Sequence, residues 1–249
     1  MLRLPALFAA GLAGLLLGPL AAAGWRRGAV RLWCRVAAWA VGLRILREGN
    51  APPPGSLVAA NHVGYLDILA LGATTPGRFL AKAEVAGWPL LGLLARCGGA
   101  IFVEREQARA SLEALGALEA HQEAGETVVF FPEAGVAPDA RTLGPFRPMA
   151  FEACVRTGRP TVPVALRYTR PSDPRVWGWI EEPSLWRHLW NRLLPAGPIE
   201  VTVHFGAPLY PEPGTDRKVL AGRARQAVLE LLGGHGPSDF PPPRGTGGP

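Results

Sequence analysis

Apolar residues in the middle of the chain form short continuous runs, and stretches with helical periodicity separate these runs. The run TVVFF contains no charged residue, which is typical of a strand covered on both faces of a sheet. Such alternation favours a single α/β layered domain with a largely parallel sheet flanked by helices. The predicted strands are Ser56–Ala60, Arg78–Ala81, Ala100–Glu104, Thr127–Phe131, Thr161–Tyr168 and Glu200–Phe205. The predicted helices are Tyr65–Ala73, Pro89–Arg96, Glu106–Glu123, Met149–Thr157, Leu185–Leu194 and Asp216–Leu232.

Segments rich in Pro and Gly divide the chain into three parts. Residues 51–55 read APPPG, a stiff linker that ends an N-terminal region of residues 1–50. Residues 233–249 are rich in Gly and Pro and predict a disordered tail. The α/β domain is therefore expected over residues 51–232.

The N-terminal region begins with a candidate membrane span. Leu4–Ala23 carries no charge over 20 residues, about the length that crosses a hydrocarbon core. Several arginines follow this segment and only Arg3 precedes it, so the positive-inside rule places the rest of the chain in the cytoplasm. We expect a protein of the inner (cytoplasmic) membrane with its catalytic domain on the cytoplasmic side. A cleaved signal peptide is the alternative, because residues 21–23 resemble a cleavage site.

The next segment, Trp25–Leu46, is predicted to be a membrane-associated helix. Arg27, Arg31 and Arg35 recur every four residues on one face, and apolar residues gather mostly on another. Such a helix can rest in the headgroup zone of a bilayer. The alternative is a helix that docks on the α/β domain by its apolar side. The membrane interpretation is favoured because a candidate span directly precedes the helix.

The charge and the cysteines narrow the range of functions. The net charge of +6 suits anionic partners such as a membrane surface or a phosphate-bearing substrate. We find no helix-turn-helix, no zinc spacing and no basic stripe interleaved with aromatics, so we expect no nucleic-acid partner. The three cysteines form no C-x-x-C pair, which predicts neither a disulfide framework nor a metal site. None of them has a recognisable nucleophile setting.

The stretch NHVGYLD carries the candidate chemistry. Within one helix, His62 and Asp67 would lie about 140° apart and would not face each other. If His62 ends a strand and Asp67 lies in the first turns of the next helix, the loop lets the imidazole fold toward the carboxylate. A carboxylate that accepts from one ring nitrogen raises the basicity of the other, which makes a general base. The alternative is that His62 merely caps the helix and Asp67 is a solvated first-turn acid.

Three further strand-end motifs follow in order: GGAIFVERE, VVFFPEAG and RPTVPVALRY. Behind an apolar N-terminus, this series resembles the glycerolipid acyltransferase family, which includes bacterial 1-acyl-glycerol-3-phosphate acyltransferases. The resemblance spans roughly Arg44 to Pro208. It implies a membrane-associated O-acyltransferase of phospholipid biosynthesis that transfers a fatty acyl group to the hydroxyl of a lysolipid. The implied partners are membrane lipids and either acyl-CoA or acyl-carrier protein, a co-substrate, with no cofactor and no metal.

The resemblance also implies roles for individual residues. His62 would take the proton from the lysolipid hydroxyl, and Asp67 would orient the imidazole. Arg105 would hold the anionic head of the acceptor, although a surface ion pair is the alternative for this residue. Glu133 would shape the same pocket. The substrate-binding set is therefore Arg105, Glu133, Gly135 and Arg147.

One block departs from the family pattern, which usually reads FPEG followed by Thr and Arg. Here Ala134 replaces the glycine and Val136 stands at the arginine position, so a bidentate phosphate clamp is missing. A branch that acylates lyso-ornithine lipid looks similar at KAEVAGWPLLG, GPFRPMAF and VTVHFG, and its acceptor carries no glycerol phosphate. Lysophosphatidate, lyso-ornithine lipid and a non-catalytic lipid-binding paralogue therefore stay open. A hydrolase is not favoured, because the chain has no G-x-S-x-G elbow.

Overall fold

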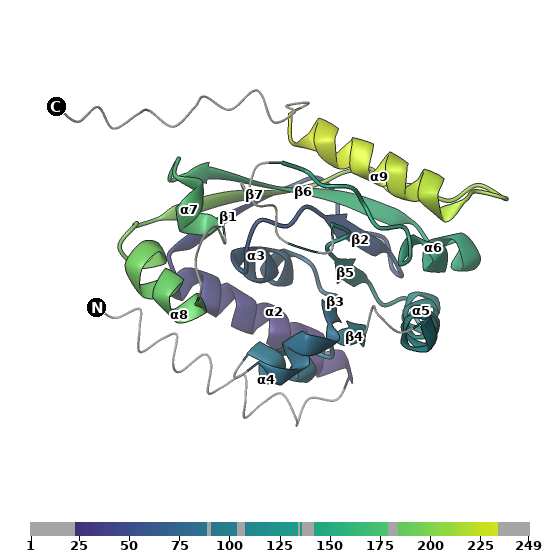
Figure 1. Cartoon of the computed structure of the whole chain (residues 1–249), viewed down its shortest axis with the longest axis horizontal. Helices are drawn as coiled ribbons and strands as arrows, with labels where there is room; N and C mark the ends of the chain where they lie inside the picture. The colour runs from purple at the N-terminus through teal and green to yellow at the C-terminus, as the bar shows by residue number, and fades with distance from the viewer. Residues whose placement is uncertain are drawn as a thin grey trace.

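The structure, a computed structural model, describes residues 23–88, 91–103, 108–133, 135, 142–178 and 184–233. In this part of the chain a seven-stranded sheet lies between two layers of helices (Figure 1). The order of strands across the sheet is β1-β7-β6-β2-β5-β3-β4. The strands are β1 (Leu43–Glu48), β2 (Leu57–Ala60), β3 (Arg78–Lys82), β4 (Ile101–Val103), β5 (Val128–Phe130), β6 (Thr161–Arg170) and β7 (Ile199–Phe205).

Strand pairing is parallel over most of the sheet. The central strand, β2, is parallel to both of its neighbours, β5 and β6. The parallel arrangement continues from β5 to β3 and β4. On the other side, β6 and β7 pair antiparallel, and β1 is parallel to β7. The prediction of an α/β domain with a largely parallel sheet is confirmed.

Helices cover both faces of the sheet. Each strand and helix predicted after the linker is present, with ends within two residues of the expected ones. One layer holds α2 (Ala23–Ala40), α3 (Leu66–Thr74), α7 (Pro174–Trp177), α8 (Leu185–His188) and the π-helical turn η2 (Leu189–Leu193). The other layer holds α5 (Ala108–Glu123), α6 (Phe151–Thr157) and α9 (Arg217–Leu231). Beside β3 and β4 lie the 3-10 turn η1 (Ala83–Gly87) and α4 (Leu91–Cys97).

The central strand is buried from both sides, because successive side chains of a strand point to opposite faces. Val58 and Ala60 of β2 belong to the hydrophobic cluster that includes α3. Leu57 and Ala59 belong to the second cluster, which includes α5, α6 and α9. This double cover explains why the apolar strand runs in the sequence are not interrupted by polar residues.

The N-terminal part of the fold corrects one prediction. The helix expected over Trp25–Leu46 ends at Ala40, and the residues after it form β1. This strand pairs with β7 along its whole length, so the region before the linker contributes to the sheet. Leu43 is buried and Ile45 is half-buried, whereas Arg44 between them is exposed. That alternation is typical of an edge strand with one covered face.

The apolar face of α2 packs against α3. Cys34 and Ala37 are buried, whereas Arg31 and Arg35 are exposed. Arg31 Nε donates to the carbonyl of Ala73 in the last turn of α3, at 3.2 Å. The interpretation of this face as membrane-facing is therefore corrected, because the domain itself covers it. The alternative, a helix docked by its apolar side, describes α2.

Two expectations fall outside the described residues. Of the apolar segment Leu4–Ala23, the structure describes only Ala23. Of the expected tail, residues 233–249, it describes only Gly233. Among the helices that the structure describes, none has both the length and the apolar character required to span a bilayer.

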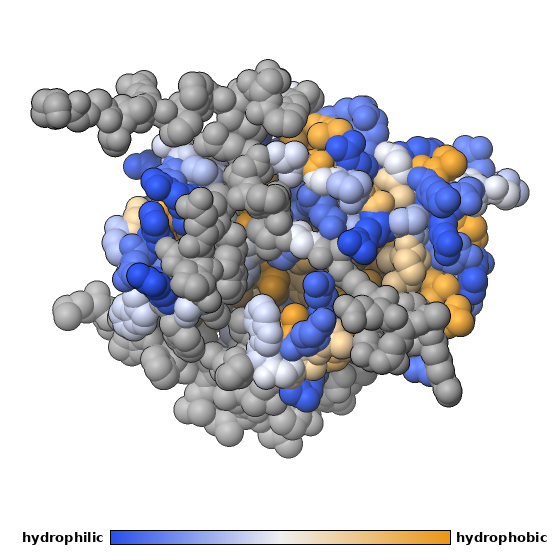
Figure 2. Space-filling view, in the orientation of Figure 1, coloured by the Kyte–Doolittle hydropathy of each residue, from blue (hydrophilic) through white to orange (hydrophobic). Residues whose placement is uncertain are grey.

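Hydrophobic residues on the face seen in Figure 2 show as separate areas among hydrophilic ones. Large apolar side chains are exposed singly on several elements, among them Leu112 of α5 and Val219 of α9. Isolated exposure of this kind is normal for a folded domain.

We expect Gly72→Ala to destabilise the fold, because Gly72 is a point where α3 touches α2. A Cβ atom there would overlap the thiol of buried Cys34, and overpacking a core costs about 1–3 kcal/mol. Gly116 on α5 is the matched control, since a Cβ atom there meets open space. Gly116→Ala should raise the free energy of unfolding by up to about 1 kcal/mol. Chemical denaturation of both variants should give changes of opposite sign.

The cause of the Gly72→Ala effect is tested by removing the sulfur. In a double-mutant cycle, Cys34→Ala should recover part of the free energy of unfolding lost in Gly72→Ala. Equal stabilities of Gly72→Ala and the wild-type protein would contradict the close packing of the two helices.

Candidate active site

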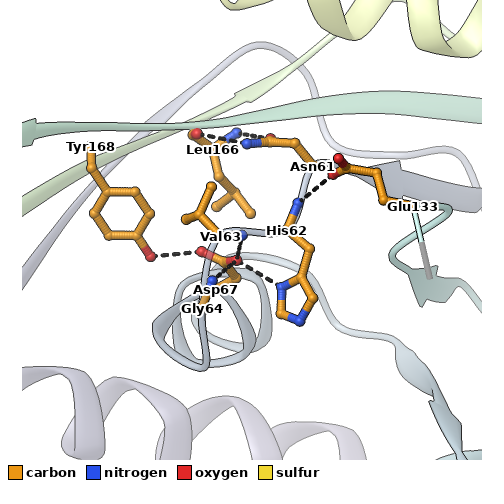
Figure 3. Close-up of polar contacts among 8 residues, drawn as sticks. All are labelled: Asn61, His62, Val63, Gly64, Asp67, Glu133, Leu166 and Tyr168. Carbon is orange, nitrogen blue, oxygen red and sulfur yellow. Dashed lines mark hydrogen bonds and ion pairs between the residues drawn. The ribbon is translucent and has the colours of Figure 1, made fainter. Parts of the chain in front are cut away.

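Three adjacent strands bring the candidate residues to one edge of the sheet (Figure 3). His62 follows the end of β2, and Glu133 follows the end of β5. Tyr168 lies on β6, past the point where β6 pairs with β2. Because β5, β2 and β6 are mutually parallel, their carboxyl ends meet at the same edge, where ligands bind in open α/β sheets.

The side chain of Asn61 fixes the start of the motif. Its Nδ2 donates to the carbonyl of Leu166 at 3.1 Å, and its Oδ1 accepts from the amide of Leu166 at 2.7 Å. The amide group of Asn61 thus continues the hydrogen bonding between β2 and β6 for one more position. Because Asn61 is buried, these two bonds also satisfy polar atoms that water cannot reach. The chain therefore leaves β2 in a fixed direction.

The imidazole of His62 faces the carboxylate of Asp67. The Nδ1 atom lies 2.8 Å from Oδ2 of Asp67. His62 stands at the strand end and Asp67 in the first turn of α3, which is the geometry that the sequence predicted. The side chain of His62 is 17% exposed, whereas that of Asp67 is fully buried.

Asp67 accepts further hydrogen bonds that fix its orientation. Its Oδ2 also accepts from the amides of Val63 at 2.7 Å and Gly64 at 3.0 Å. Its Oδ1 accepts from the hydroxyl of Tyr168 at 2.8 Å. An ionised carboxylate only accepts hydrogen bonds, so Nδ1 of His62 carries the ring proton that points to it. Nε2 of His62 is then the basic nitrogen.

The ring of Phe131 holds the imidazole from one side. The two ring centroids are 3.9 Å apart, and the rings are inclined by 14°. Phe131 immediately follows β5, the strand next to β2. Stacking therefore limits rotation of the His62 ring, while Asp67 fixes its in-plane direction.

Glu133 ties two backbone segments together. Its Oε1 accepts from the amide of His62 at 2.9 Å, and its Oε2 accepts from the amide of Gly144 at 2.6 Å. Burial raises the pKa of Glu133 above its ordinary value, while these two amides act in the opposite direction. Arg225 of α9 donates to the carbonyl of Gly144 at 2.9 Å and holds the same segment from outside. Both oxygens of Glu133 therefore position backbone next to the imidazole.

Of the other predicted substrate-binding residues, the structure describes Gly135 and Arg147. Arg105 lies outside the described residues. Gly135 is exposed, and a Cβ atom there would meet open space. Arg147 is exposed, and its amide donates to the carbonyl of Pro132 at 2.9 Å, one residue before Glu133. The structure thus places the backbone of residue 147 beside the FPE block.

Sequence reasoning gave no role to Tyr168, Phe131 or Asn61. Tyr168 and Phe131 end apolar strand runs, where an aromatic residue also suits the core. Asn61 precedes His62, where an amide also suits a turn. The available signal was their position at strand ends, because residues there gather at the ligand-binding edge of a parallel sheet.

Two of the cysteines have no nucleophilic character. Cys34 and Cys154 are buried. Burial raises the pKa of Cys34 to about 12 and raises the pKa of Cys154 as well. Both thiols therefore stay protonated near neutral pH. In the part of the chain that is described, no group of three or more His, Cys, Asp or Glu side chains could hold a metal ion.

A cavity of about 330 Å³ lies on the layer that holds α2 and α3. It is open to solvent, and it includes neither His62 nor Asp67. Three arginines and apolar side chains line it, and no carboxylate does. Its lining residues are Arg31, Arg35, Ala38, Trp39, Leu43, Ile45, Arg47, Ala73 and Thr74.

Comparison with known proteins places this chain in a family. Residues 44–167 match a family model described as Acyltransferase. A lyso-ornithine lipid O-acyltransferase from Rhodobacter capsulatus is 34% identical over 215 residues, which cover 84% of this chain and 77% of the relative. A 1-acyl-sn-glycerol-3-phosphate acyltransferase from Neisseria gonorrhoeae is 38% identical over 141 residues, which cover 57% of this chain and 55% of the relative.

A solved structure shares the fold. The crystal structure of the 1-acyl-sn-glycerophosphate acyltransferase PlsC from Thermotoga maritima superposes with a TM-score of 0.63 at 22% identity, covering 88% of this chain and 87% of that one. This structural likeness shows the fold alone, and the assignment to a family rests on the sequence matches. This chain belongs to the 1-acyl-glycerol-3-phosphate acyltransferase family, and it is an acyltransferase.

We expect Glu133→Gln to lower the free energy of unfolding by about 1–3 kcal/mol. The N–H₂ group of the glutamine side chain would face a backbone N–H that donates to a carboxylate oxygen of Glu133 in the wild-type protein, so one hydrogen bond is lost. Acyl transfer should fall as well, since the backbone of His62 is less firmly held. Glu152→Gln is the matched control: Glu152 pairs with exposed Arg156, and such pairs contribute about 0–1 kcal/mol. Denaturation curves and rates of both variants measure the difference. A Glu133→Gln protein as stable as Glu152→Gln would contradict the bridging role.

Proposed function

We propose that the chain transfers a fatty acyl group from an acyl thioester to the hydroxyl of a lysolipid, with His62 as general base. The observation that carries this proposal is the contact between Nδ1 of His62 and the buried carboxylate of Asp67. It leaves Nε2 free to accept a proton at a partly exposed position on the carboxyl edge of the sheet. The membership of the chain in the acyltransferase family supplies the reaction class.

The reaction needs no covalent acyl-enzyme intermediate. Nε2 of His62 removes the proton from the lysolipid hydroxyl as the oxygen attacks the thioester carbonyl carbon. The carbon–sulfur bond then breaks, and the imidazolium returns its proton to the departing thiolate. An ester and a free thiol are formed. Asp67 keeps the ring in the productive tautomer and stabilises the imidazolium.

We expect His62→Ala to abolish acyl transfer, because no other described side chain next to Asp67 offers a basic nitrogen. The rate from labelled acyl-CoA or acyl-carrier protein should fall by at least about 100-fold, the lower end of general-base contributions. His204→Ala is the matched control, since His204 is likewise a histidine next to a carboxylate. Its Nδ1 lies 3.4 Å from Oε2 of Glu48, which belongs to the neighbouring strand. This control should keep its rate, and thermal melting should show both variants folded.

Other outcomes would favour a different function. Retained transfer by His62→Ala would refute the assigned base. A lipid-binding protein without catalysis would take up lysolipid, consume no thioester and be indifferent to Asp67→Asn.

The acceptor that we propose is a lyso-ornithine lipid. Relatives with this activity align with 83–86% of the chain, in four bacteria, whereas the Neisseria relative with the glycerophosphate activity aligns with 57%. Val136 stands where the family usually has an arginine, so a phosphate clamp is missing. Lysophosphatidate is the second candidate, because the shorter alignment has the higher identity, 38%.

The predicted substrate-binding set fits an acceptor with an anionic head. We propose that Arg105 and Arg147 contact the acceptor's carboxylate or phosphate, in line with the resemblance. The backbone contact between Arg147 and Pro132 supports this, since it brings residue 147 to the segment that contains Glu133.

We propose that the chain works at the cytoplasmic membrane and takes acyl-CoA or acyl-carrier protein as its donor. The exposed face of α2 supports the location. Leu32 and Trp39 are 63% and 58% exposed there, next to Arg35. Arginines with an interfacial tryptophan suit the headgroup region of a bilayer. The apolar segment Leu4–Ala23 leads into this helix and ends at its first residue.

Lipid analysis tests the acceptor in a strain that lacks its own lysophosphatidate acylation. With lyso-ornithine lipid supplied, we expect ornithine lipid to accumulate and the growth defect to persist, and we expect the protein in the membrane fraction. Expression of His62→Ala is the control and should yield no product. Rescue of growth without ornithine lipid would instead identify lysophosphatidate as the acceptor.

A further inference from the structure

Asp67 has one hydrogen-bond donor that the motif itself does not supply. The His62 ring and the amides of Val63 and Gly64 belong to the same short loop and all reach Oδ2. Oδ1 is paired with the hydroxyl of Tyr168, 101 residues further along the chain, at 2.8 Å (Figure 3). Among the described residues, Tyr168 is the sole hydrogen-bond donor to Oδ1.

Tyr168 is itself held in place. Its ring stacks on Trp177 of α7, with centroids 4.8 Å apart and the ring planes inclined by 7°. Trp177 in turn donates from Nε1 to the carbonyl of Pro171 at 3.0 Å. The hydroxyl of Tyr168 is therefore aimed at Asp67 by contacts on the ring as well as by the strand.

The phenol can act only as a donor toward this carboxylate. Burial and the negative charge of Asp67 raise the pKa of Tyr168 well above its ordinary value. The hydroxyl therefore stays protonated throughout the pH range in which an enzyme of this kind works. A permanent donor at Oδ1 keeps the carboxylate from turning and draws part of its charge away from the imidazole.

We propose that Tyr168 is a positioning residue for acyl transfer, which acts by holding Asp67 so that Oδ2 faces Nδ1 of His62. This inference rests on the proposed role of His62 and Asp67. Tyr168 lies one residue beyond the region that matches the family model, which ends at residue 167. The last residues of β6 and the segment stacked on Tyr168 thus contribute to the site from outside the matched region.

The chain offers a matched comparison in Tyr65. Its hydroxyl is 2.9 Å from Nδ1 of His188, whose Nε2 lies 2.8 Å from the carbonyl of Arg175. Since a carbonyl only accepts, Nε2 of His188 carries the proton, and the Tyr65 hydroxyl donates to Nδ1. Burial raises the pKa of Tyr65 as well. Both tyrosines thus donate a partly buried phenol hydrogen bond, and the acceptor is Asp67 for Tyr168 and His188 for Tyr65.

Tyr168→Phe tests the proposal, because it removes the hydroxyl and keeps the ring on Trp177. We expect kcat to fall about 10-fold, the effect of a lost hydrogen bond to a charged group, with KM for the lysolipid unchanged. The acid limb of the pH profile of kcat/KM should move to higher pH, because the full charge of Asp67 then acts on the imidazole and favours its protonated form. A purely structural effect would lower kcat without moving this limb.

Tyr65→Phe is the control and should keep the wild-type pH profile. Thermal melting compares the stabilities of the two variants. A Tyr168→Phe enzyme with wild-type kcat and an unmoved acid limb would overturn the proposal. The same limb movement in both variants would also overturn it, since the effect would not depend on Asp67. These outcomes differ from failure of the proposed function, in which His62→Ala itself would remain active.

Discussion

The site depends on keeping a buried negative charge in one orientation. Moving a carboxylate out of water costs several kcal/mol unless hydrogen bonds replace its hydration. Asp67 is fully buried and accepts four hydrogen bonds, two from backbone amides, one from the His62 ring and one from Tyr168. The same bonds that make the charge tolerable also fix the direction of the imidazole. Stability and chemical competence therefore rest on one set of contacts at the start of α3.

The contacts that reach the site from outside the motif loop exist only when three strands lie side by side. The motif loop supplies the donors to Oδ2 locally, but Tyr168 comes from β6, and Phe131 and Glu133 follow β5. β2 lies between these strands and is parallel to both, so all three groups reach the same edge. Asn61 reinforces this by continuing the pairing of β2 with β6. The edge of the sheet is thus assembled together with the core beneath it.

This division between local and distant contacts explains what the sequence could predict. The spacing of His62 and Asp67 at a strand–helix junction, taken together with the strand-end motifs that follow it, indicated their contact. The contact of Tyr168 with Asp67 could not be inferred, because nothing local to TVPVALRY shows which strand will be its neighbour. The first four residues of β1, LRIL, were mistaken for the end of a helix, because an edge strand that alternates Leu43, Arg44 and Ile45 is too short for its period to be distinct. The helix Leu185–Leu194 was located correctly, but its π-helical second half was not foreseen.

The arrangement also separates the chemistry from the choice of acceptor. In the proposed mechanism, proton transfer needs only His62, Asp67 and the groups that hold them, and these suit any lysolipid hydroxyl. In the proposed function, recognition of the head falls to the segments that follow β4 and β5 in the sequence. The segment after β5 departs from the family pattern at Ala134 and Val136. A lost guanidinium there removes a phosphate clamp without touching the hydrogen bonds of Asp67. If the proposed function holds, acceptor specificity can change in this segment while the base and its carboxylate stay as they are.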